Sequence, residues 1–280
     1  MSVVSSPRVA LIDLDGTLYR WSLYVELVEQ LMRFQQNLPA YFFESQAQRK
    51  TWEERSLHDD AYLSQVIHDW EARSIMGLSE NELVLAVREV LRKQKSRSYI
   101  FTREMVAVLK ERGYHLIAIG GSPKPMIQAL AKEWNIDEAY GAEYVVDTLR
   151  VYSRNQAQAK QMDQRKADVV RAALKDGLLD DGSIALGDAG GDWTILKQVT
   201  HPIAFNPDQA LYLKARQAGI PVVWERKNVV CAYQTYPEQL GVREDAFLFH
   251  EVPWSKILPL DVAELLTKRL RALDQTSTAG

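Results

Sequence analysis

The sequence has few of the features that mark several large classes of protein. It contains one cysteine, Cys231, among 280 residues, which excludes an intrachain disulfide framework and fits a reducing compartment. No stretch approaches the ~20 apolar residues of a membrane-spanning helix, and no secretory signal pattern opens the chain. The net charge of -3 gives no reason to expect nucleic acid or an anionic membrane as a partner. We therefore expect a soluble cytoplasmic protein.

Further absences argue against whole classes of catalyst. Paired cysteine or histidine ligands for zinc are missing, and neither a P-loop nor a GxGxxG fingerprint occurs. Gly120-Gly121-Ser122 begins like the nucleophile elbow of a serine hydrolase, but Lys124 stands where that elbow requires glycine. Chemistry based on zinc, a bound nucleotide cofactor or a serine nucleophile is therefore not supported.

Short apolar runs, each followed by turn residues, recur along the chain. They cover residues 9–12, 116–119, 184–186 and 203–205. Such runs are typical of strands that are buried on both faces of a parallel sheet. Helical patterns separate them, including one that begins at Thr102, its expected N-cap, and ends at Gly113. This alternation predicts an α/β fold, a three-layer Rossmann-like core with a mostly parallel sheet.

Helical periodicity replaces this alternation after the first strand. Ser79 and Glu82 have the spacing of a capping box at the start of one helix in this region. We therefore predict an inserted all-helical domain at residues 21–98. The α/β core would comprise residues 1–20 and 99–235, and residues 236–280 would form a C-terminal extension packed on the core.

Acidic residues follow two of the predicted strands. Asp13 and Asp15 come at the end of the first run, and Asp188 and Asp192 follow the run at 184–186. Ligands of open α/β sheets bind beyond the carboxyl ends of the strands. Carboxylates that gather there repel one another unless a cation or a shared proton relieves them, and Mg²⁺ prefers such oxygen ligands. A helix start near Ser122 adds a potential anion site.

Four short motifs, in this order along the chain, resemble those of the haloacid dehalogenase-like hydrolase superfamily. They are Asp13-Leu14-Asp15-Gly16-Thr17-Leu18, Ser122, Lys166, and Gly187-Asp188 with Asp192. The resemblance covers roughly residues 9–224. It is strongest to the phosphoserine phosphatase-like branch, whose members carry a helical cap domain at the position of the predicted insert.

The resemblance implies a Mg²⁺-dependent phosphatase that hydrolyses a small phosphate monoester through an aspartyl-phosphate intermediate. Asp13 would be the nucleophile and Asp15 the general acid and base. Mg²⁺ would be held by the Asp13 carboxylate, the Asp15 carbonyl and Asp188, with Asp192 in support. The implied partner is a small phosphorylated metabolite.

The resemblance also implies how the substrate is held. The residues expected to bind the phosphate group are Ser122, Gly121, Lys166 and Thr17. Ser122 and Lys166 would also count as catalytic residues. Lys160 is the second choice if the helix that begins near Lys166 has another register.

Two positions narrow the choice within the superfamily. Asp15 argues against a dehalogenase, because a halide leaving group needs no proton. Ser22 stands where phosphoserine phosphatases carry a glutamate that reads the substrate's amino group, which argues against phosphoserine itself. A phosphotransferase on the same core and a non-catalytic binding or regulatory protein with a retained phosphatase fold are the alternatives. The sequence leaves the oligomeric state open.

Overall fold

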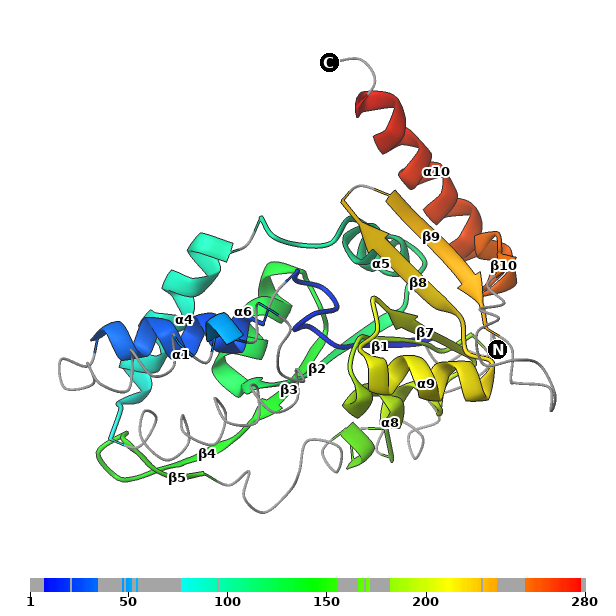
Figure 1. The fold of residues 1–280 in the computed structure, drawn as a ribbon. Helices are drawn as coiled ribbons and strands as arrows, with labels where there is room; N and C mark the ends of the chain where they lie inside the picture. Colours follow the sequence, from blue (N-terminus) through cyan, green and yellow to red (C-terminus); the bar gives the residue numbers. More distant parts are fainter. Residues whose placement is uncertain are drawn as a thin grey trace, which may run out of the picture.

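The structure is a computed structural model. It describes residues 8–20, 22–34, 77–94, 96–155, 182–227, 229–235 and 250–277, together with 47, 49–51, 54, 166–168 and 170–171. Within these residues the chain forms an α/β core, two helices inserted after its first strand, and a C-terminal extension (Figure 1).

The core is built on an eight-stranded sheet in the described part of the chain. Its strand order is β10-β9-β8-β7-β6-β1-β2-β3. The bounds are β1 (Val9–Ile12), β2 (His115–Pro123), β3 (Glu138–Ala142), β6 (Ile184–Gly187), β7 (His201–Phe205), β8 (Val222–Arg226), β9 (Val229–Gln234) and β10 (His250–Glu251). All neighbours from β3 to β8 are parallel, and β9 and β10 are antiparallel additions. The predicted mostly parallel sheet is confirmed.

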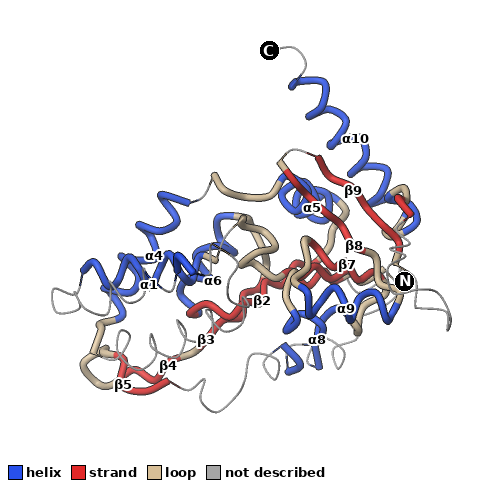
Figure 2. The backbone as a smooth tube through the Cα atoms, in the orientation of Figure 1, coloured by secondary structure: helices blue, strands red, loops and turns tan. Residues whose placement is uncertain are grey.

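Helices cover both faces of this sheet, which makes three layers. One face packs against α5 (Ile100–Glu111), α6 (Lys124–Glu133) and α10 (Leu260–Ser277). The other packs against the short helix α8 (Trp193–Leu196) and α9 (Gln209–Ala218). Figure 2 shows the two sets of helices on opposite sides of the strands. Because every residue of β1 is buried, its apolar run without alternation follows directly from this double coverage.

The insert after β1 contributes two described helices, α1 (Leu23–Phe34) and α4 (Glu80–Gln94). Buried leucines and valines of both helices join the apolar cluster on the α5 side of the sheet. The predicted capping box is confirmed: the Ser79 N–H donates to Glu82 Oε2 at 2.8 Å, and the Glu82 N–H donates to Ser79 Oγ at 3.3 Å. Most of the region between α1 and α4 lies outside the described residues, so the 21–98 boundary stays a prediction.

A small hairpin that the sequence patterns did not reveal contacts this insert. It consists of β4 (Tyr144–Val146) and β5 (Tyr152–Asn155) and follows β3. Tyr152 exchanges backbone hydrogen bonds with the residues just before α4: its N–H donates to the Leu78 carbonyl, and its carbonyl accepts the Gly77 N–H. The hairpin was not predicted because its two strands are short and lack a clear alternation of apolar and polar residues.

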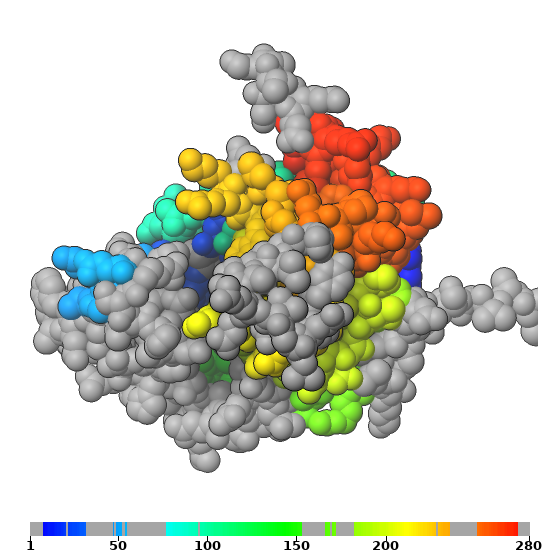
Figure 3. Space-filling model, turned by 45° about the vertical axis from the view of Figure 1, so that its right-hand side comes forward, coloured from blue at the N-terminus to red at the C-terminus, as the bar shows by residue number. Residues whose placement is uncertain are grey.

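Antiparallel strands precede the C-terminal helix. The boundary at residue 236 stays a prediction, because residues 236–249 lie outside the described part of the chain. After β9 and β10, a 3₁₀ turn (Trp254–Lys256) leads into α10. Val262 and Leu266 are fully buried on the face of α10 that packs against the core. Figure 3 shows this extension, in orange and red, against the gold strands at one end of the molecule.

One predicted helix start is wrong. Thr102 was expected to cap the helix that ends before Gly113, but α5 begins two residues earlier, at Ile100. Thr102 is a buried residue inside the helix, and its hydroxyl has no hydrogen-bond partner. The cap comes from Glu225 of β8, whose carboxylate accepts the N–H groups of Ile100 and Phe101. A cap supplied from a distant strand leaves no local pattern for sequence analysis to detect.

Candidate active site

The candidate site lies at the carboxyl ends of three adjacent strands. β1 pairs in parallel with β2 on one side and with β6 on the other. Asp13 follows β1, Ser122 is the penultimate residue of β2, and Asp188 follows β6. The Asp13 N–H donates to the Leu186 carbonyl of β6 at 3.0 Å, which fixes the first loop against the neighbouring strand. This edge is where open α/β sheets bind their ligands.

A buried lysine joins two of the carboxylates. Lys166 Nζ donates to Asp13 Oδ1 at 2.9 Å and also to Asp192 Oδ1. The exposed fractions of Lys166, Asp13 and Asp192 are only 4%, 6% and 1%. Lys166 lies in the short helical stretch at 166–168, whereas the alternative, Lys160, lies outside the described residues. The structure thus brings Lys166 together with two of the aspartates that the family resemblance groups with it.

The loop after β6 is folded around Asp192. Asp192 Oδ2 accepts the backbone N–H groups of Asp188 and Ala189, each at 2.9 Å. A side chain at Gly187 would collide with it, since a Cβ there would lie 2.3 Å from the Cβ of Asp192. Asp192 therefore has both oxygens engaged, one by backbone amides and one by the lysine, in keeping with the supporting position expected for it.

The turn that follows β1 contacts the side chain of Asp188 through Gly16 and Thr17. The Thr17 hydroxyl donates to Asp188 Oδ1 at 2.9 Å. Gly16 has a φ of 85°, and a Cβ there would lie 2.0 Å from Asp188 Oδ2, so only glycine permits this approach. Thr17 was expected to bind phosphate, but its fully buried hydroxyl is directed to a carboxylate. Gly121, also expected at the phosphate, is an exposed residue of β2.

Asp15 has different partners from the other acids. Its Oδ2 accepts the Ser122 hydroxyl at 2.5 Å, and its Oδ1 accepts the Leu23 N–H, at the start of α1, at 2.7 Å. Burial raises the pKa of Asp15, while the hydrogen bonds from Ser122 and Leu23 act to lower it. Asp15 therefore connects the strand ends of the core to the first inserted helix.

Burial and mutual repulsion control the titration of the cluster. Burial, with the neighbouring Asp192 charge, raises the pKa of Asp13 to about 7 despite the opposing effect of Lys166. Burial and the charges of Asp13 and Asp192 likewise raise the pKa of Asp188 well above its usual value. Burial alone would lower the pKa of Lys166, but the Asp13 and Asp192 carboxylates outweigh it and raise that pKa. The carboxylates thus lack sufficient positive charge.

The donor set fits a divalent cation. Oxygens of Asp13, Asp188 and Asp192 lie within 4.8 Å of one another. Three carboxylates share a single ammonium group, that of Lys166, so a hard cation would relieve the repulsion among them. Because the oxygens of Asp192 already have three donors, Asp13 and Asp188 are the more available ligands.

Sequence reasoning missed the support beneath the Asp188 loop. Asp208, the N-cap of α9, accepts the Leu211 N–H at 2.6 Å through one oxygen and the Gly190 N–H at 3.1 Å through the other. Its own N–H donates to the Asp188 carbonyl at 2.7 Å. An aspartate just before a helix signals an N-cap, but its contact with a loop some 20 residues earlier depends on the tertiary fold.

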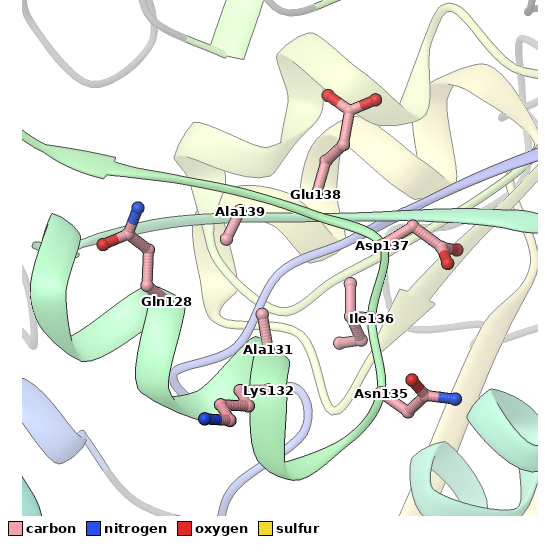
Figure 4. Close-up of a pocket in the computed structure, with 8 residues that line it drawn as sticks. All are labelled: Gln128, Ala131, Lys132, Asn135, Ile136, Asp137, Glu138 and Ala139. Atoms are coloured by element: carbon pink, nitrogen blue, oxygen red, sulfur yellow. The ribbon is translucent and has the colours of Figure 1, made fainter.

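A cavity of about 420 Å³ lies away from these residues (Figure 4). It is lined by Gln128, Ala131 and Lys132 of α6 and by Asn135, Ile136, Asp137, Glu138 and Ala139. Glu138 begins β3 and pairs in register with Ile117 near the start of β2. The cavity is therefore at the amino ends of these parallel strands, opposite the edge that carries the aspartates.

The family model for haloacid dehalogenase-like hydrolases matches residues 10–197. The chain belongs to this family. The match includes all four motifs, so the resemblance expected from the sequence is confirmed at the level of the family. Within the described residues, no helix is long and apolar enough to cross a membrane.

Individual relatives show which branch of the family this chain is similar to. A phosphoserine phosphatase of Archaeoglobus fulgidus is 27% identical over 109 residues, which is 39% of this chain and 32% of that protein. The aligned part thus spans about a third of the length of that relative. Over that part, this chain is similar to a phosphoserine phosphatase.

Solved structures show the same fold at low identity. A protein of unknown function from Bordetella pertussis Tohama I has a TM-score of 0.61 and 19% identity, over 78% of this chain and 98% of that one. A phosphoserine phosphatase with bound substrate has a TM-score of 0.52 and 18% identity, over 75% and 91%. A phospho-aspartyl intermediate analogue of phosphoserine phosphatase has a TM-score of 0.51, also at 18% identity, with the same coverage. The Rossmann-like fold of this family is thereby confirmed.

Proposed function

We propose that this chain is a Mg²⁺-dependent phosphatase that hydrolyses a small phosphate monoester through an aspartyl-phosphate intermediate. The observation that carries the proposal is the position of Lys166, which bonds Asp13 at one oxygen and leaves the other available for attack. The structural likeness to an aspartyl-phosphate analogue of phosphoserine phosphatase is in line with this chemistry.

In the first step Asp13 attacks phosphorus. The bond between Asp13 Oδ2 and phosphorus forms as the ester P–O bond breaks, and Asp15 gives its proton to the departing oxygen. The raised pKa of Asp15 favours the protonated form that this step needs. Lys166, and Ser122 once it turns from Asp15, would donate hydrogen bonds to the phosphoryl oxygens.

In the second step water replaces the aspartate. Asp15, now a carboxylate, takes a proton from the water as the water oxygen bonds to phosphorus. The bond between phosphorus and Asp13 then breaks, which regenerates both aspartates and releases inorganic phosphate. The Leu23 N–H, which donates to the Asp15 carboxylate, would stabilise it between the two steps.

The cation would be held by Asp13, Asp188 and the Asp15 carbonyl. When bound, Mg²⁺ supplies positive charge that offsets repulsion between the Asp13 carboxylate and the substrate phosphate. Asp192 would keep Lys166 and the Asp188 loop in position. Thr17 would orient Asp188 through its hydroxyl. We propose this role for Thr17 in place of a contact with the phosphate.

The residue that precedes the first inserted helix bears on the choice of substrate. Ser22 precedes α1 and its hydroxyl accepts the Val25 N–H at 3.4 Å. An uncharged residue there provides no counter-charge for an amino group. We therefore propose a small phosphate ester whose leaving group differs from serine.

The test is hydrolysis of p-nitrophenyl phosphate with Mg²⁺ by the wild type and by Asp13→Asn. We expect the variant to lose activity by about 10³-fold or more, because it lacks the nucleophile. The wild type should also be trapped with ³²P from a labelled ester after acid quenching, whereas Asp13→Asn should not. Equal rates for the two proteins would disprove the mechanism.

A further inference from the structure

The two connections between the core and the inserted helices are paired with each other. The first linker (described at residues 19, 20 and 22) and the second linker (residues 97–99) form an antiparallel bridge between Tyr19 and Ser98. The Arg20 N–H donates to the Arg97 carbonyl at 2.8 Å. Any movement of the insert relative to the core must therefore pass through this paired segment.

Arg20 links this pair to the core. Its Nε donates to the Ser98 carbonyl at 3.2 Å, and its Nη2 donates to Glu225 Oε1 at 2.5 Å and to the Lys227 carbonyl at 3.2 Å. Its guanidinium carbon lies 5.1 Å from the ring centroid of Tyr99, within the range of a cation–π contact. One side chain thus holds both linkers and the turn after β8.

Glu225 is a suitable anchor because it is buried and fully engaged. Its side chain has 0% exposure. Besides Arg20, it accepts the N–H groups of Ile100 and Phe101 at 3.0 and 2.8 Å, where the dipole of α5 is positive. Its own N–H donates to Asn206 Oδ1 at 2.8 Å, just after β7. A buried carboxylate with this many donors is held in one place.

The first linker also leads directly to Asp15. Only seven residues separate Asp15 from Leu23, and the Leu23 N–H donates to Asp15 Oδ1 at 2.7 Å. Arg20 lies between them. The ion pair of Arg20 with Glu225 therefore fixes where the start of α1 meets the Asp15 carboxylate.

We propose that Arg20 and Glu225 are positioning residues that hold Asp15 in the geometry needed for proton transfer. This inference rests on the proposed function, in which Asp15 is the general acid and base. Through Glu225, strand β8 would then affect proton transfer by Asp15, although neither Arg20 nor Glu225 contacts the cluster around Lys166.

The experiment compares two substrates that differ in their need for an acid. p-Nitrophenyl phosphate has a good leaving group that requires little protonation, whereas the alkoxide of β-glycerol phosphate requires a proton. The variants are Glu225→Gln, Arg20→Gln and the double variant. The matched control is Glu104→Gln, whose carboxylate also lies on the α5 side of the sheet but pairs with Arg269 of α10.

We expect Glu225→Gln and Arg20→Gln to lower kcat/KM for the alkyl ester about tenfold, part of the roughly 10²–10⁴-fold that acid–base catalysis provides. The comparison uses kcat/KM because this quantity reports the first step, in which Asp15 acts as the acid, whereas hydrolysis of the intermediate is common to both esters. The loss with the aryl ester should be at most about threefold, and the double variant should lose little more than either single one. Glu104→Gln should affect both esters equally. A merely structural role would lower both activities together and leave their ratio unchanged, which would overturn the proposal.

Hydrogen exchange supplies a readout that is independent of activity. We expect the Arg20, Leu23 and Tyr99 amides to exchange faster in Glu225→Gln and in Arg20→Gln than in the wild type or in Glu104→Gln. Unchanged exchange at these amides would also overturn the proposal. Failure of the phosphatase mechanism is recognised separately, since Asp13→Asn would then match the wild type on both esters while the exchange result still stands.

Discussion

Two buried groups of charged residues differ in how well their negative charges are matched by positive charges and hydrogen-bond donors. Around Lys166, the carboxylates of Asp13, Asp188 and Asp192 share one ammonium group. Around Glu225, one carboxylate has a guanidinium partner and two helix N–H groups. The first group has an excess of negative charge and the second is satisfied by the protein alone.

This difference in charge distinguishes the candidate active site around Lys166 from the group around Glu225. Burial of unbalanced carboxylates is unfavourable, and the raised pKa values of Asp13 and Asp188 express that strain. The cation of the proposed function would offset this excess of negative charge. The group at Glu225 needs no ligand, which agrees with a positioning role.

Removal of the positively charged side chain from each group should have the largest effect on stability, and the loss should be greater for Lys166 than for Arg20. Lys166→Met leaves buried carboxylates without their ammonium partner, so we expect a loss of about 3–5 kcal/mol in the free energy of unfolding. Arg20→Met should cost less, because the Arg20 side chain is 35% exposed whereas that of Lys166 is 5% exposed. Urea denaturation without divalent cation measures both.

The control for this comparison is Lys124→Met. Lys124 pairs with Glu143 at 2.6 Å, but both side chains are well exposed, so we expect a change within about 1 kcal/mol. If Lys166→Met were as mild as Lys124→Met, the buried group would not depend on its lysine and the contrast with Glu225 would be lost.

The charge excess should also make stability depend on pH. The pKa of Asp13 is raised from 3.8 to about 7, so the folded state keeps a proton that the unfolded chain releases. The resulting stability is complete below pH 3.8 and is lost as the pH rises through about 7. Mg²⁺ should counter this loss, so thermal denaturation should show a larger rise in Tm on adding Mg²⁺ at pH 8 than at pH 5.

Asp13→Asn sharpens this test, because it removes the titrating group. We expect its stability without metal to vary less between pH 5 and pH 8 and its Mg²⁺-induced rise in Tm to be smaller. A wild type whose Tm responded equally to Mg²⁺ at both pH values would show that cation binding does not relieve the carboxylates.

A smaller effect is expected from the hydroxyl that orients Asp188. Thr17→Val removes the hydrogen bond to Asp188 Oδ1. Loss of such a contact beside a metal ligand typically weakens metal binding by about 10–100-fold, so the Mg²⁺ concentration for half-maximal activity should rise about tenfold. Thr102→Val is the control, since its buried hydroxyl has no partner and the variant should require no more Mg²⁺ than the wild type.

The fold class was predictable because the signals are local. The runs at β1, β2, β6 and β7 lack alternation because helices cover both faces of the sheet, and this coverage makes every position apolar. The hairpin β4–β5 was not predictable, since its short strands depend on contacts with the insert. The helix start at Ile100 was misjudged because Glu225, 125 residues later, supplies its cap.

The sequence by itself determined the chemistry available at the strand ends. Asp13, Asp15 and Asp188 stand in turns directly after buried strands, and Lys166 stands in a helical stretch; each belongs to a recognisable motif. Their roles in catalysis remain the proposal made above. The motifs did not show that the hydroxyl of Thr17 is directed to Asp188, because a hydroxyl takes whichever acceptor the fold brings near.

The tertiary structure alone decided how these residues are held. Asp208 supports the Asp188 loop from the next helix, and Glu225 joins β8 to the linkers of the insert. Both are ordinary acids in the sequence. Their function depends on which N–H groups and which guanidinium lie within about 3 Å, and residues far apart in the chain provide those partners.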